Sequence, residues 1–235
     1  IKHSMSIKND LYTVLNDFGK ESLQIEFQSN IHSSVPKIKE ILSKTIAMRD
    51  EKKDKQMNNN YNYNDSEKPL SLLCEAFLHY LLTTTLLPSQ RKIMLKDVEI
   101  DLVIPDLKSL YKDPTKGLII KFDKDSKTFD YINRLQNNIP IYKENIWLVS
   151  STPLCINYRN YVIYKNQKDE ESHTLFINEN NMDVNSCYFN QNNEGNNNKS
   201  NIQNVNSKVI PFFNIIVDIN KFLKDTKHTG FKFVP

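Results

Sequence analysis

Cysteine is scarce in this sequence. Its three cysteines, Cys74, Cys155 and Cys187, are far apart and odd in number. No CxxC pair or Cys/His spacing typical of a zinc site occurs, and nothing in the spacing indicates a disulfide framework. We therefore expect a reduced intracellular compartment, either cytoplasm or a nucleus or nucleoid.

Long apolar runs and a strong charge bias are also missing. No run approaches ~18 uninterrupted apolar residues, so no membrane span is expected. The first ten residues, IKHSMSIKND, lack the apolar stretch of a signal peptide. A net charge of +3 and a pI of about 8.6 permit nucleic-acid binding. They do not by themselves argue for it, because dedicated nucleic-acid binders are more basic.

Asparagine-rich stretches, in contrast, are prominent. They account for much of the low hydrophobic fraction, 39%, and of the mean hydropathy of −0.56. We expect residues 57–68 to form a disordered loop and residues 178–206 to form an insertion. The predicted organisation is a helical N-terminal appendage, residues 1–56, followed by an α/β domain, residues 69–235. No internal repeat is visible.

The N-terminal part predicts two helices and a strand. Residues 7–18 carry apolar side chains at helical spacing, and Gly19 is a natural stop. Residues 22–28 alternate apolar and polar side chains, which is typical of a short strand. A further helix begins near Ser34 and Pro36. The apolar stripes of these helices could serve a homodimer or another protein partner, so a protein–protein module is one interpretation.

The segment from residue 69 to residue 83 predicts a helix that is apolar nearly all round and therefore buried. Glu75 and His79 are its polar exceptions. A carboxylate in such a helix must be paired, bind a cation or face a cleft.

The remaining chain predicts a mixed α/β architecture, with helices covering a central sheet. A hairpin of residues 91–95 and 98–104 is expected to precede a buried strand at 117–122. Antiparallel decoration is expected after the core. The further elements expected are a helix at 126–136 with Phe129, Ile132 and Leu135 facing inward, a strand at 145–150, a hairpin at 161–165 and 173–177, a strand at 212–217 and a helix capped by Asp218.

Acidic side chains gather on one strand of this sheet, and a lysine lies on the next. Asp97, Glu99 and Asp101 share a strand face because side chains alternate, and Lys121 lies in the apolar run GLIIKF. Carboxylates can hold Mg²⁺, which polarises a phosphodiester and deprotonates a water. A nearby lysine can stabilise the charge that develops on the phosphate.

From residue 69 to about 152 the chain resembles the PD-(D/E)xK nuclease superfamily, which has the restriction-endonuclease-like fold. Glu75 matches the family's helix glutamate, Asp101 its strand aspartate and Lys121 its lysine. The acidic position two residues before the lysine is Ile119, which departs from the motif.

The resemblance implies a nucleic-acid-acting protein with Mg²⁺-dependent phosphodiester hydrolysis. Asp101 and Glu99 would be metal ligands, Glu75 an outer or orienting acid, and Lys121 the charge-stabilising group. Ile119 implies the alternative of a catalytically inactive member that binds nucleic acid or serves as a scaffold.

Structural readings of the same residues stay open beside the functional ones. Asp101 could pair with Arg91 or Lys92, and Lys121 could pair with Asp101 or extend to the sheet edge. Glu75 could bond the backbone or His79, while Glu99 could be exposed and His79 could lie in the core. Three C-terminal tyrosines could stack on bases or pack in the core, namely Tyr158, Tyr161 and Tyr164.

Overall fold

The computed structural model describes residues 2–56, 68–124, 127–154, 156–164 and 209–227. The predicted loop at 57–68 lies outside this part except for Lys68. The strand predicted at 173–177 and the insertion at 178–206 lie outside it entirely.

Three helices form the N-terminal part: α1 (Lys2–Phe18), α2 (Lys20–Ser29) and α3 (Val35–Gln56). The strand predicted at 22–28 is wrong, because this segment is α2. Leu23 and Phe27, four residues apart, are buried, whereas Ile25 between them is 71% exposed. The buried residues Leu23 and Phe27 therefore have helical spacing. The alternation of Leu23, Ile25 and Phe27 indicated a strand only because Ile25, which does not enter the core, was counted with them.

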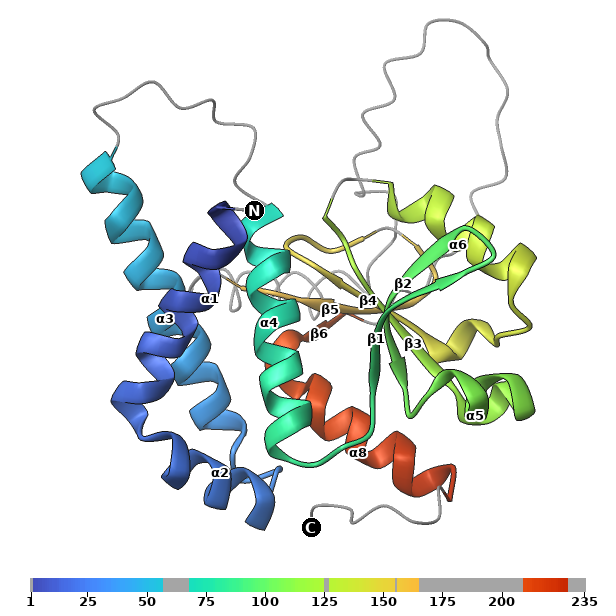
Figure 1. The fold of residues 1–235 in the computed structure, drawn as a ribbon, viewed down its shortest axis with the longest axis horizontal. Helices are drawn as coiled ribbons and strands as arrows, with labels where there is room; N and C mark the ends of the chain where they lie inside the picture. The colour runs from blue at the N-terminus through green and yellow to red at the C-terminus, as the bar shows by residue number, and fades with distance from the viewer. Residues whose placement is uncertain (1, 57–67, 125–126, 155, 165–208, 228–235) are drawn as a thin grey trace, which may run out of the picture.

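Helix α4 (Lys68–Thr84) lies between the N-terminal helices and the sheet (Figure 1). Its buried side chains lie around most of its circumference, as predicted: Leu70, Leu73, Cys74, Phe77, Leu78, Leu81 and Leu82. Leu11, Val14 and Leu15 of α1 belong to the same apolar core. The apolar face of α1 is therefore covered within the chain by α4.

The sheet has six strands in the order β1-β2-β3-β4-β5-β6. The first two pairs, β1–β2 and β2–β3, are antiparallel, and the next three pairs are parallel. The strands are β1 (Gln90–Leu95), β2 (Val98–Ile104), β3 (Leu118–Phe122), β4 (Ile146–Ser150), β5 (Arg159–Val162) and β6 (Val209–Pro211).

Helices cover both faces of this sheet. Helices α4 and α8 (Ile215–Asp225) lie on one face, and α5 (Leu107–Lys112) and α6 (Thr128–Asn138) lie on the other (Figure 1). Two apolar clusters result, one containing Leu102, Ile120 and Trp147, the other containing Ile119 and Leu148. The predicted mixed sheet flanked by helices is confirmed.

The predicted antiparallel decoration is wrong for the described C-terminal strands. β5 pairs in parallel with both β4 and β6. Residues 160–162 are buried, as is typical of strands inside a parallel sheet that is covered on both faces. The polar segment after Tyr164 indicated a hairpin turn, but the strand before it is an interior one.

Two further predictions are corrected at the helices. The strand predicted at 212–217 is a short 3₁₀ turn (Phe212–Asn214) followed by α8, so the helix begins before Asp218. In α6, Phe129 is 63% exposed, and Thr128 is buried beside Ile132 and Leu135 instead. The helix begins at Thr128, which sets the inward face at Thr128, Ile132 and Leu135.

Candidate functional site

The candidate site lies where β2 separates from β3. The two strands pair only over residues 102–104 and 118–120, whereas β2 continues its pairing with β1 down to Val98. Beyond Leu102 the backbone N–H of Phe122 has no β2 partner, and it donates to Oδ2 of Asp101 at 3.0 Å. The Asp101 carboxylate thus fills the opening between the strands.

An irregularity in the hairpin accompanies this placement. The register of β1 with β2 has no Lys92–Asp101 pair, and Lys92 has a positive φ of 49°. Side-chain alternation also shifts here, because Ile100 packs with the α6-side core whereas Leu102 packs with the α4-side core. Local irregularities of this kind re-aim side chains at sheet edges.

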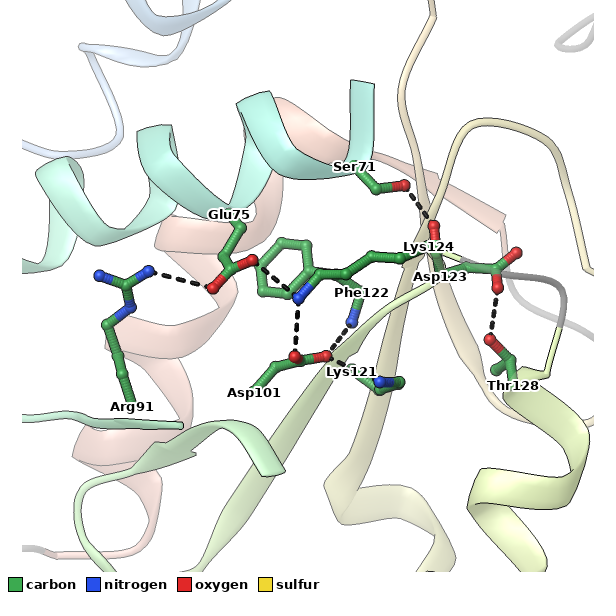
Figure 2. Close-up of polar contacts among 9 residues, drawn as sticks. All are labelled: Ser71, Glu75, Arg91, Asp101, Lys121, Phe122, Asp123, Lys124 and Thr128. Atoms are coloured by element: carbon green, nitrogen blue, oxygen red, sulfur yellow. Dashed lines mark hydrogen bonds and ion pairs between the residues drawn. The ribbon is translucent and has the colours of Figure 1, made fainter. Parts of the chain in front are cut away.

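The structure brings together three of the predicted site residues: Asp101, Lys121 and Glu75. Lys121 Nζ lies 3.1 Å from Asp101 Oδ2, so the acid on β2 and the lysine on β3 meet (Figure 2). Glu75 of α4 joins them through Lys124, whose Nζ lies 2.7 Å from Asp101 Oδ1 and 2.8 Å from Glu75 Oε2.

Arg91 completes this cluster from β1. Its Nη2 lies 3.0 Å from Glu75 Oε1, so its partner is Glu75 and not Asp101 across the hairpin. We call Glu75, Arg91, Asp101, Lys121 and Lys124 the ion-pair cluster. It contains three cations and two carboxylates.

The carboxylates of the ion-pair cluster are buried and its cations are partly exposed. The exposed fractions of the side chains are 2% for Asp101 and 6% for Glu75. They are 14% for Lys121, 20% for Lys124 and 27% for Arg91. Burial of Lys124 disfavours its charge, but the attraction of Asp101 and Glu75 outweighs this and raises its pKa.

Tyr131 of α6 borders the cluster on the other side of Lys121. Lys121 Nζ lies 4.3 Å from the centre of the Tyr131 ring, a cation–π distance. The Tyr131 hydroxyl is buried without a hydrogen-bond partner. Burial raises the pKa of Tyr131, and the charges of Asp101 and Glu99 raise it further.

Glu99 and His79 do not join the cluster. Glu99 is exposed on β2, and its side chain is not among the ion pairs of the described residues. His79 is exposed on α4, so it is not the core histidine that was one interpretation. Of the three tyrosines, Tyr161 is buried and donates to Asp218 Oδ2 at 2.7 Å, which places it in the core.

Sequence reasoning missed Lys124. It lies just beyond the end of β3, in the short acidic and basic run FDKD. The turn that carries it is anchored at Asp123: Ser71 donates to the Asp123 carbonyl, and Thr128 Oγ1 donates to its carboxylate at 2.6 Å (Figure 2). A basic residue directly after the strand that carries Lys121 was the available signal.

As folded, the ion-pair cluster does not fit a divalent cation. All four carboxylate oxygens of Glu75 and Asp101 already contact nitrogen donors. Two residues before Lys121 stands Ile119, which is not acidic and is fully buried in the apolar cluster on the α6 side of the sheet. No group of three acidic, histidine or cysteine side chains suited to a metal occurs in the part of the chain that the structure describes.

Comparisons with known proteins bear on the fold. No protein-family model and no curated protein matches this chain. Among solved structures, the restriction endonuclease PspGI in its substrate DNA complex has a TM-score of 0.57 at 14% identity, covering 93% of each chain. Metal-depleted Ecl18kI in complex with uncleaved, modified DNA has a TM-score of 0.50 at 12% identity, covering 96% of this chain and 81% of that one.

No helix in the described part of the chain has the length and apolar character required to span a bilayer.

The element order, the mixed sheet and these structural neighbours lead to one conclusion: the chain has the restriction-endonuclease-like α/β fold that its sequence predicts.

Proposed function

We propose that this protein binds nucleic acid at the ion-pair cluster, with Arg91, Lys121 and Lys124 facing the phosphate backbone, and that it does so without a bound metal. The observation that carries the proposal is the distribution of exposure in the cluster. Its carboxylates are buried and its cations are partly exposed. A phosphodiester that approaches therefore meets ammonium and guanidinium groups first.

Two features support this reading. The cluster has one more cation than carboxylates, so it retains a net attraction for an anion. Both reported structures of similar fold are complexes with DNA, which supports nucleic acid as the ligand class. In this proposal Asp101 and Glu75 orient the cations, as carboxylates commonly orient arginine and lysine side chains.

The test is the affinity of the full chain for labelled DNA and RNA oligonucleotides, measured by fluorescence anisotropy in EDTA. Lys121→Met removes a cation that faces the ligand, so the affinity should fall about tenfold. This fall corresponds to the free energy of one hydrogen bond to a charged group. Lys108→Gln, an exposed lysine of α5 outside the cluster, is the matched control and should bind as wild type does. Equal affinities of wild type and Lys121→Met would refute the proposal.

Mg²⁺-dependent phosphodiester hydrolysis is the second candidate, and it requires Mg²⁺ to displace Lys124 from Asp101 and Glu75. The 3.1 Å contact of Asp101 with Lys121, on the strands that the family resemblance assigns to them, favours it. In that case wild type should cleave oligonucleotides when Mg²⁺ is added, and Asp101→Ala should lose all cleavage while keeping its circular dichroism spectrum. If wild type binds oligonucleotides but does not cleave them in Mg²⁺, hydrolysis is excluded and metal-free binding remains the proposed function.

A further inference from the structure

Lys124 occupies the space between two carboxylates that face each other from different elements. Its Nζ lies 2.7 Å from Asp101 Oδ1 on β2 and 2.8 Å from Glu75 Oε2 on α4 (Figure 2). A cation shared by Asp101 and Glu75 would have to lie between the same two oxygens. The lysine ammonium therefore takes the place that a bridging ion would need.

The outer oxygens of the two carboxylates are also engaged. Asp101 Oδ2 accepts from the Phe122 backbone and contacts Lys121, and Glu75 Oε1 contacts Arg91. No free carboxylate oxygen is left in this pair to bind an ion from the other side. A divalent cation could enter only by displacing a cation of the protein.

The Lys124 ammonium is held in this place by its surroundings. Ser71 and Thr128 both anchor Asp123, the residue directly before it. Its ammonium also contacts one carboxylate oxygen on each side, at 2.7 Å and 2.8 Å. The attraction of both carboxylates therefore holds the ammonium between them.

We propose that Lys124 is the built-in counter-ion of a latent divalent-cation site formed by Asp101 and Glu75. The lysine holds the helix and the strand together as a metal would, and it excludes Mg²⁺ and Mn²⁺. Replacing it with a neutral side chain exposes two facing carboxylates, which then bind a divalent cation. This inference concerns the cation alone and is independent of nucleic-acid binding.

The experiment is a titration of the full chain with Mn²⁺ alone, by isothermal calorimetry and by thermal unfolding. Wild type should show no stoichiometric binding, and Mn²⁺ should not raise its Tm. Lys124→Gln should bind one Mn²⁺ at least about tenfold more tightly than wild type, because a competing positive charge has been removed. Its Tm should rise with the Mn²⁺ concentration, as ligand linkage requires.

Two controls locate the effect. Lys108→Gln removes a lysine outside the cluster and should behave as wild type does. In Asp101→Asn/Lys124→Gln, one of the two carboxylates is gone, so the gained Mn²⁺ binding should be lost again.

Three results would overturn the inference. One is stoichiometric Mn²⁺ binding by wild type as tight as that of Lys124→Gln, and another is a folded Lys124→Gln that gains no Mn²⁺ binding. If Lys124→Gln is unfolded without metal, circular dichroism should show that Mn²⁺ restores its fold. A failure of Mn²⁺ to restore it is the third.

Discussion

At the scale of single residues, the two lysines of the ion-pair cluster differ in the number of carboxylates that they contact. Lys124 contacts both buried carboxylates of the cluster, whereas Lys121 contacts Asp101 and the Tyr131 ring. Removing one partner from a buried ionic group costs more than the pair contributes, because the remaining charges are left uncompensated. The lysines are therefore not equivalent, and Lys124 should matter more for stability than Lys121.

The charge of Lys124 should appear in the pH dependence of stability. Its folded pKa is raised above the ordinary value of 10.5. Its contribution is therefore complete below about pH 10.5 and is lost as the pH rises through the folded pKa. Lys124→Met should unfold with a free energy about 1–3 kcal/mol lower than wild type near pH 8, and this gap should shrink near pH 11.

Urea unfolding of both proteins at the two pH values measures the gap, and tyrosine titration cancels in the comparison. Lys108→Met serves as the control for a lysine outside the cluster. A gap that is the same at both pH values would show that the ammonium charge of Lys124 is not what stabilises the fold.

At the scale of elements, the sequence predicts correctly the helices and strands whose apolar spacing matches the side chains that are buried in the fold. The helix at 69–83, the hairpin and the strands at 117–122 and 145–150 were all predictable, because their apolar positions enter the core as their spacing indicates. Residues 22–28 and 212–217 were not predictable in this way. Each contains an apolar run that is consistent with a strand or a helix, and only tertiary burial decides between them.

The candidate site was predictable in its acids and in Lys121 but not in its geometry. Asp101, Glu75 and Lys121 lie on elements whose order along the chain is readable. The divergence of β2 from β3 and the return of Lys124 toward α4 depend on long-range packing. Pairing of Asp101 with Arg91 or Lys92 across the hairpin was one open interpretation, but α4 supplies a closer acid for Arg91, Glu75.

Asp218 is the residue that joins α8 to the parallel half of the sheet. Its Oδ2 accepts from Arg159 Nη2 and from the Tyr161 hydroxyl, both at 2.7 Å, and Arg159 also stacks on Trp147. Asp218→Asn keeps an acceptor for Tyr161 but loses the charge that Arg159 faces. It should lower the free energy of unfolding by about 1–3 kcal/mol.

Chemical denaturation measures this loss, with Asp225→Asn as the control. Asp225 is exposed at the end of the same helix, so its substitution should change stability by no more than about 0.5 kcal/mol. Equal effects of the two substitutions would mean that the Arg159–Asp218–Tyr161 contacts do not hold α8 on the sheet.

At the scale of the whole molecule, the N-terminal helices share a core with the sheet. Leu15 is fully buried in the cluster that contains α4 and Trp147. Lys39 of α3 also lies over the Phe213 ring, at 5.3 Å. The division of the chain at residue 56 stays a prediction. So does a homodimer or protein partner at the N-terminal helices, although α4 already covers the apolar face of α1.

Leu15→Ala tests this continuity. It should cost about 2–5 kcal/mol. It should also shift the unfolding midpoint reported by Trp147, the single tryptophan, together with that reported by far-UV circular dichroism. The exposed Asn16→Ala is its control. A Trp147 transition that Leu15→Ala leaves unmoved would show that residues 1–56 are a separately folding appendage.

The salt dependence of nucleic-acid affinity is the decisive measurement of whether phosphate binds at the ion-pair cluster. Each phosphate neutralised by the protein contributes about 0.7–0.9 to the slope of log affinity against log salt concentration. Lys121→Met should lower the magnitude of this slope by about one relative to wild type. Lys108→Gln should leave it unchanged. A Lys121→Met protein with the slope and affinity of wild type would contradict the claim that phosphate binds at the ion-pair cluster.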